Sequence, residues 1–210
     1  MKEIIDITVG LERNMPSWPG SIGFNIDSTS ELSSGKCSNN SKIECDVHIG
    51  THIDAPWHFI EDGLTVEKLS LDKMIGEVCV IDLQDVEMID REILSKQNYP
   101  DNLKRILFKT NNSKLWKNKE TNFKKDYVAL TKDGAEWIVE NSIELVGIDY
   151  LSIQRFSDSY ATHEILLKNE IVILEGVCLS NVEPGSYELF CLPMKIIGAD
   201  GAPARVILMR

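Results

Sequence analysis

The segment from residue 44 to residue 59 constrains the fold of this chain more than any other. It reads ECDVHIGTHIDAPWHF. Its β-branched residues, together with Gly50 and Pro56, exclude a continuous helix through the segment. We therefore expect an extended chain that passes through His48 and His52 and ends at Pro56.

This segment also holds most of the histidines. Of the four histidines in the chain, three fall here, at His48, His52 and His58, and Asp54 stands among them. Imidazole nitrogen and carboxylate oxygen are ligands that zinc, manganese and iron(II) prefer. Alternate side chains of an extended strand share a face, and a bend at Gly50 would bring these groups together. A polar strand face in water is the alternative interpretation.

A second group of candidate residues lies far along the chain. His163 opens a short apolar segment, and Glu175 ends an apolar run. A carboxylate next to a buried strand is costly unless it is paired, and a metal cation is a sufficient partner. A basic partner or a strand end in water would serve equally. Asp149 is a weaker candidate of the same kind, while Asp200 and Arg205 could pair with each other.

Hydrophobic patterning predicts a mixed α/β fold. An alternating pattern predicts a strand over residues 3–9, and further strands are expected over residues 76–83, 104–110, 144–148, 170–175, 187–192 and 204–209. Helices are expected over 132–142, with Thr131 as the N-cap, and over 162–168. Residues 28–41 read as a surface loop, and residues 111–126 as a solvated excursion. Strands and helices alternate only in the second half, which favours an incompletely parallel, mixed sheet.

Size and charge narrow the class of protein. The chain has 210 residues, and its length fits one domain over residues 1–210. A net charge of −11 argues against nucleic acid and anionic membranes as partners. Five cysteines without a CxxC spacing make a disulfide framework or a thiolate zinc site a poor interpretation. Glu3 and Asp6 stand where a signal peptide would be apolar, so we expect a cytoplasmic protein.

The histidine segment resembles the signature of the cyclase family, HxGTHxDxPxHF, and matches it at every fixed position. Residues 146–153, 163–167, 173–176, 192–195 and 200–205 resemble later blocks of the same family. Bacterial kynurenine formamidase and isatin hydrolase are family members. The resemblance implies a swivelling β/β/α fold in a single domain with a mixed sheet. It also implies a homodimer or homotetramer.

The resemblance further implies a metal-binding role for five residues. His48, His52 and Asp54 would hold one ion, and Asp54, His163 and Glu175 a second, with Asp54 bridging the two. Zinc is the favoured divalent ion for such histidine and carboxylate ligands, and manganese is the alternative.

Matching positions also imply how the substrate is handled. His58 would be the catalytic acid and base, and Trp18 would stack on an aromatic substrate. The chain departs from the formamidase pattern at residues 21–23, 109–110 and 155–160. These departures bear on the substrate and leave the metal ligands intact.

The sequence therefore predicts a metal-dependent hydrolase of C–N bonds other than peptide bonds. The leading reaction is arylformamidase-like, from N-formyl-L-kynurenine to L-kynurenine and formate. A cyclic amide or lactone is the alternative substrate, as in isatin hydrolase. A non-catalytic member that binds a small aromatic ligand is a further alternative. An iron(II) oxygenase built on His52, Asp54 and His163 would leave His48 and His58 unexplained.

Overall fold

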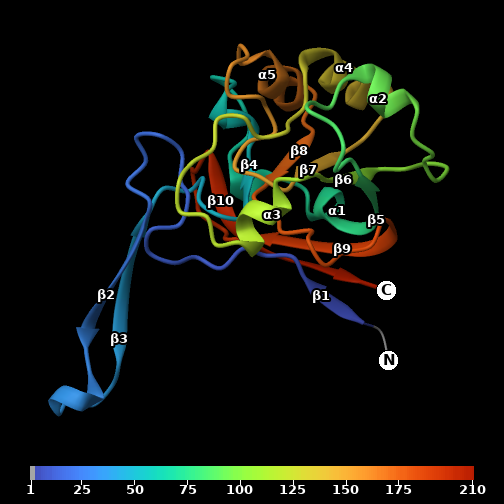
Figure 1. Cartoon of the computed structure of the whole chain (residues 1–210). Coiled ribbons are helices and arrows are strands. Elements are labelled where there is room, and N and C mark those ends of the chain that lie inside the picture. Colours follow the sequence, from blue (N-terminus) through green and yellow to red (C-terminus); the bar gives the residue numbers. More distant parts are fainter. Residues whose placement is uncertain (1–2) are drawn as a thin grey trace.

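A mixed sheet forms the body of the protein, which is described by a computed structural model over residues 3–210. Its strands are β1 (Ile4–Asp6), β4 (His52–Asp54), β5 (Ile75–Asp82), β6 (Arg105–Lys109), β7 (Leu145–Ile148), β8 (Val172–Glu175), β9 (Gly185–Pro193) and β10 (Gly201–Met209). They lie in the order β1-β10-β4-β8-β7-β6-β5-β9, and β9 also pairs with β10. This extra pairing closes the sheet into a barrel-like arrangement (Figure 1). Strands β5 to β8 run parallel and the other pairs antiparallel, which confirms the predicted mixed sheet.

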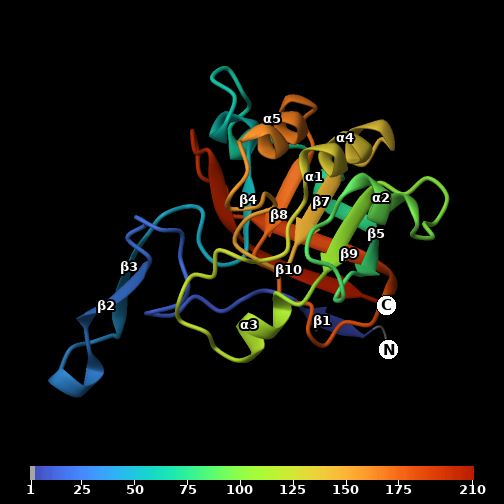
Figure 2. The ribbon, with the colours of Figure 1, turned by 45° about the horizontal axis from the view of Figure 1, so that its top comes forward.

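The structure also contains short helices. They are α1 (Leu71–Met74), α2 (Arg91–Ser95), α3 (Ser113–Lys117), α4 (Lys132–Glu140) and α5 (Ala161–Lys168), with 3-10 turns at Leu32–Ser34, Pro56–His58 and Val66–Lys68. Helices α2, α4 and α5 lie together above the strands β5 to β8 (Figures 1 and 2). The side chain of Thr131 accepts a hydrogen bond from the Gly134 amide, so the predicted N-cap is confirmed. Within residues 3–210, no helix has the length and apolar character needed to span a membrane.

Two hydrophobic cores lie on opposite faces of the sheet, and the two-residue period of a strand divides side chains between them. On β5, Val78 and Val80 point into the barrel, whereas Cys79 and Ile81 point toward the helices. Leu166 of α5 belongs to the helix-side core. Each predicted strand overlaps a strand of the structure. Strands β6 to β8 are buried at consecutive positions and therefore appear in the sequence as apolar runs.

The predicted surface loop over residues 28–41 is instead part of a hairpin arm. Strands β2 (Phe24–Ser30) and β3 (Asn40–Cys45) pair with each other and project away from the barrel (Figure 1). Phe24 at the base of the arm is buried, while the cross-strand pair of Ile26 and Ile43 is exposed. The loop prediction holds for residues 31–39, which connect the two strands, and was wrong for residues 28–30 and 40–41, which belong to them. Serine and asparagine dominate the arm, so its strands lack an apolar period.

The predicted solvated excursion over residues 111–126 is also wrong in part. Helix α3 lies within it, and Ser113 at its start is buried. The Trp116 indole donates to the backbone oxygen of Asp149 at 2.9 Å. Phe123 belongs to an aromatic group beside the cavity described below. Lysines on the exposed side of the segment hide these buried contacts in the sequence.

Candidate metal centre

Strand β4 carries the central residues of the candidate site. It lies between β8 and β10 and pairs antiparallel with both. Ile53 points into the barrel core, so the neighbouring His52 and Asp54 point to the opposite face, where α5 lies. The strand register places His52 directly opposite Glu175 of β8. The predicted shared face of His52 and Asp54 is thus present.

Two glycines allow the chain to approach itself closely beside this strand. Gly50 has φ +57° and Gly176 has φ +69°, which are left-handed values that favour glycine. A Cβ atom on Gly176 would lie 1.9 Å from the backbone oxygen of Gly50. The Thr51 hydroxyl closes the contact by donating to the Gly176 oxygen at 2.6 Å. The expected bend at Gly50 therefore exists and turns the chain into the site.

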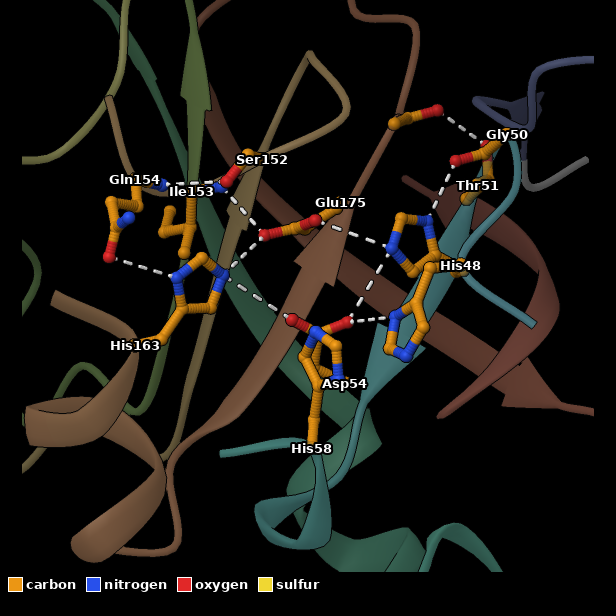
Figure 3. A network of polar contacts seen from close by, with 12 residues as sticks. His48, Gly50, Thr51, Asp54, His58, Ser152, Ile153, Gln154, His163 and Glu175 are labelled. Carbon is orange, nitrogen blue, oxygen red and sulfur yellow. Dashed lines mark hydrogen bonds and ion pairs between the residues drawn. The ribbon is translucent and has the colours of Figure 1, made fainter. Parts of the chain in front are cut away.

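Four buried side chains face one another in the inner part of the site (Figure 3). The Nε2 atom of His52 lies 3.3 Å from Glu175 Oε2 and 3.5 Å from Asp54 Oδ1. The Nε2 atom of His163, on α5, lies 3.3 Å from Glu175 Oε1 and 3.6 Å from Asp54 Oδ2. Each imidazole therefore faces one oxygen of each carboxylate.

The other nitrogen of each of these rings has a partner that fixes its orientation. His52 Nδ1 lies 3.0 Å from the Gly50 carbonyl oxygen, and His163 Nδ1 lies 3.2 Å from Gln154 Oε1. Because both partners are acceptors, Nδ1 carries the proton and Nε2 keeps a lone pair. Lone pairs that face carboxylate oxygens repel them unless a cation lies between. This donor set therefore fits a divalent metal ion.

An outer group of side chains adjoins the inner one. His48 Nδ1 lies 2.8 Å from Asp54 Oδ1, and His48 Nε2 lies 2.9 Å from Asp200 Oδ2. The same Asp200 oxygen lies 3.2 Å from His58 Nδ1, and the rings of His48 and His58 stack with centroids 3.9 Å apart. The outer group is half-buried, in contrast to the inner residues.

Potential ligand atoms gather in three groups within the described residues, each with all its atoms within 4.8 Å of one another. They comprise His48, His52 and Asp54, then Asp54, His163 and Glu175, and finally His48, His58 and Asp200. Asp54 is shared by the first two groups, which is the position a bridging carboxylate requires. The ligand role of each residue stays a prediction.

The carboxylates of the inner group stay ionised despite their burial. Burial raises the pKa of Asp54, but the charge and hydrogen bond of His48 outweigh it and hold the pKa well below its ordinary value. Burial and the charge of Asp54 likewise raise the pKa of Glu175, but its contacts with the imidazoles of His163 and His52 lower the pKa by more, so that it lies below its ordinary value. The inner group therefore offers two negative charges to a cation.

The imidazoles of the outer group differ in charge. Burial lowers the pKa of His48, but the charge of Asp54 and hydrogen bonds to Asp200 and Asp54 raise it to about 10. The hydrogen bond from His48 lowers the pKa of Asp200 to about 2. Burial lowers the pKa of His58, and the charges of His48 and His163 add to this effect against the opposing charge of Asp54. A neutral His58 can accept a proton near neutral pH.

A cavity of about 480 Å³ opens onto both groups. Trp18 and Tyr160 line it, as does Phe59, whose ring stacks on His163 with centroids 4.6 Å apart. Trp18 itself packs against Phe123 and Phe156, with centroids 5.1 and 5.5 Å apart. The cavity wall is therefore aromatic beside the histidines, and the substrate-stacking role of Trp18 stays a prediction.

The structure corrects the expected pairing of Asp200 with Arg205. Arg205 pairs with Asp6 at 2.6 Å, so Asp200 is left to contact the histidines. Sequence reasoning also missed Gln154, for which no motif gave a signal. Asp149, a weaker candidate ligand, accepts hydrogen bonds from loop residues and lies in none of the three ligand groups of residues 3–210.

Comparison with known proteins agrees with this geometry. The sequence model of the cyclase family matches residues 5–155. Cyclase-like protein 3 of Oryza sativa subsp. japonica is 37% identical over 99% of this chain and 80% of its own length. Kynurenine formamidase of Bacillus cereus is 35% identical over 98% of this chain and 97% of its own.

A solved structure extends the likeness to the fold. A protein described as a predicted metal-dependent hydrolase from Bacillus stearothermophilus is 31% identical, with a TM-score of 0.85 over 100% of this chain and 98% of its own. The chain therefore belongs to the cyclase family, as its sequence predicted. The predicted enzyme class, a metal-dependent hydrolase, is confirmed with it.

Proposed function

We propose that this hydrolase cleaves the C–N bond of an aromatic formamide or amide, with N-formyl-L-kynurenine as the leading substrate. The observation that carries the proposal is the pair of buried imidazole nitrogens facing two buried carboxylates, beside an aromatic-walled cavity. The relationship to the formamidase of Bacillus cereus supports this choice of substrate. The aromatic residue Trp18 in the cavity wall supports an aromatic substrate.

The inner group is the proposed place for a divalent ion. His52, Asp54, His163 and Glu175 would hold it, and His48 would extend the site toward a second ion. Zinc is the proposed ion, because imidazole-rich ligand sets suit it, and manganese is the alternative. When bound, a divalent ion lowers the pKa of water to about 7 and polarises a carbonyl group.

His58 is the proposed acid and base. Its Nδ1 atom donates to Asp200, so Nε2 is the nitrogen that can accept a proton from the attacking water. The same nitrogen can then return the proton to the leaving nitrogen of the amide. The lowered pKa of His58 keeps the ring neutral at the start of the cycle. Trp18 and Phe59 would exclude water and hold the aromatic ring of the substrate.

The experiment combines metal analysis with an assay of N-formyl-L-kynurenine hydrolysis. We expect stoichiometric metal and release of formate, and we expect His58→Ala to lower kcat by about 10²–10⁴-fold with its metal content unchanged. Trp57→Ala is the matched control, because Trp57 neighbours His58 in the same turn, is 46% exposed and lies outside the cavity lining. Normal turnover by His58→Ala would refute its role. Cleavage of isatin but not of the formamide would point to a cyclic amide.

A further inference from the structure

Asp200 is placed by the backbone at the edge of the site. It directly precedes β10, whose first residue, Gly201, pairs with Asp54 in the strand register. The Asp200 carbonyl accepts a hydrogen bond from the Ala55 amide at 2.9 Å. Gly201 lies against the His48 ring so closely that a Cβ atom there would be 2.7 Å from His48 Cε1. The position of Asp200 relative to the histidines is therefore fixed by β-sheet contacts.

One oxygen of Asp200 contacts two imidazoles. Oδ2 lies 2.9 Å from His48 Nε2 and 3.2 Å from His58 Nδ1, and the two rings are stacked. A carboxylate oxygen has two lone pairs, so it can accept from both N–H groups at once. Each contact also determines which ring nitrogen stays free to bind a metal or to accept a proton.

The consequence for His48 is its orientation toward the inner group. With Nε2 held by Asp200, Nδ1 faces Asp54 Oδ1 at 2.8 Å and joins the group of ligand atoms that includes His52. Histidines that bind metals commonly donate their second N–H group to a carboxylate, which fixes the ring and its tautomer. The consequence for His58 is parallel, because a proton held on Nδ1 leaves the lone pair on Nε2.

We propose that Asp200 is a positioning residue that sets two rings at once, His48 toward the metal and His58 toward the substrate. The proposal rests on the proposed function for the role of His58, whereas its metal-binding half is independent of the substrate. The one alternative on geometric grounds is that Asp200 is itself a ligand, since its oxygen lies within 4.8 Å of ligand atoms of His48 and His58. Hydrogen-bond distances to both rings, on a side chain 36% exposed, favour the positioning role.

The test compares Asp200→Asn, Asp200→Ala and Asp200→Glu in the full chain. Zinc affinity is measured by competition with a chromophoric chelator, and kcat and KM are measured on N-formyl-L-kynurenine at saturating zinc. We expect Asp200→Ala to lower zinc affinity by about 10–100-fold without changing the zinc stoichiometry. At saturating zinc, kcat should fall by a similar factor with little change in KM, and Asp200→Glu should restore part of both losses.

The matched control is Asp6→Asn. Asp6 lies on β1 and pairs with Arg205 of β10, outside the site. This substitution should leave zinc affinity and kcat unchanged. Zinc affinity and kcat of Asp200→Ala equal to those of the wild type would overturn the proposal. Loss of one whole zinc equivalent would overturn it in favour of a ligand role. Zinc binding by a wild type that cleaves no amide would instead refute the proposed function, and the affinity series would still test the effect of Asp200 on His48.

Discussion

Two neighbouring parallel strands end in buried carboxylates, and the two have different partners. Asp149 directly follows β7, and Glu175 ends β8. Asp149 accepts hydrogen bonds from the Thr110 amide at 2.8 Å, the Thr110 hydroxyl at 2.6 Å and the Ser113 amide at 3.0 Å. Within residues 3–210, the Glu175 carboxylate accepts from one amide, that of Ile153 at 2.6 Å, and otherwise faces the imidazoles described above.

This comparison shows that burial alone does not identify a metal ligand. Burial raises the pKa of Asp149 in spite of its hydrogen bonds from Thr110 and Ser113, whereas histidine partners hold the pKa of Glu175 below its ordinary value. Asp149 is satisfied by donors that anchor the loop after β6. Glu175 faces nitrogen atoms that can themselves be ligands. The kind of partner, rather than the depth of burial, therefore separates an anchoring carboxylate from a metal-binding one.

The largest expected effect comes from Glu175→Ala. This substitution removes the carboxylate oxygens that face His52 and His163, which are proposed metal ligands. Zinc affinity should therefore fall by more than about 100-fold, beyond the usual cost of losing a residue that only positions a ligand. Competition with a chelator measures the change, and Asp149→Ala serves as the matched control from the neighbouring strand. If Glu175→Ala bound zinc with the stoichiometry and affinity of the wild type, Glu175 would not be a metal ligand.

Asp149→Ala should instead lower stability. It leaves two buried amides and a hydroxyl without their acceptor, which should cost about 3 kcal/mol in the free energy of unfolding. Denaturant unfolding of the metal-free protein measures the loss, and a zinc titration of the same variant should give the wild-type affinity. A variant that is as stable as the wild type but binds zinc poorly would reverse the roles assigned to the two strand ends.

The sequence was sufficient to predict the strands of the main sheet and most of the residues that gather in the site. Continuous apolar runs marked β5 to β8, because those strands are buried on both faces. The clustering of histidines marked the approach to β4, and the structure places His163 and Glu175 beside His52 and Asp54. These patterns involve residues that are close together in the sequence, so they can be recognised without knowledge of distant contacts.

Other features depend on pairings that no local pattern encodes. Asp200 lies 152 residues from His48, and only the register of β10 against β4 brings them together. Arg205, closer in sequence, offered the simpler but incorrect partner. The arm of β2 and β3 is polar along most of its length, and its strands are defined by their mutual hydrogen bonds alone. Helix α3 is short, and its buried contacts alternate with exposed lysines.

Removing the metal should also distinguish Asp149 from Glu175, because zinc binding stabilises the folded protein only where the site is intact. At free zinc about 100 times its dissociation constant, binding should add about 2.7 kcal/mol to the free energy of unfolding of the wild type. Asp149→Ala should show the same increment from its lower starting value, because its site is intact. Glu175→Ala should show little increase in unfolding free energy on adding zinc. Thermal or denaturant unfolding with and without chelator measures these increments, and an equal increment in Glu175→Ala would contradict the assignment.

The smallest expected effect is that of Asp149→Asn, whereas the matching amide substitution at Glu175 should cost far more. In Asp149→Asn the remaining oxygen can still accept from the amides of Thr110 and Ser113, so the loss of unfolding free energy should be only about 1 kcal/mol. In Glu175→Gln the new amide group is a donor that would occupy the lone pair of His52 or His163, so zinc affinity should stay nearly as low as in Glu175→Ala. Chelator competition and denaturant unfolding measure both. If Glu175→Gln bound zinc like the wild type, the histidine partners would no longer distinguish the end of β8 from that of β7.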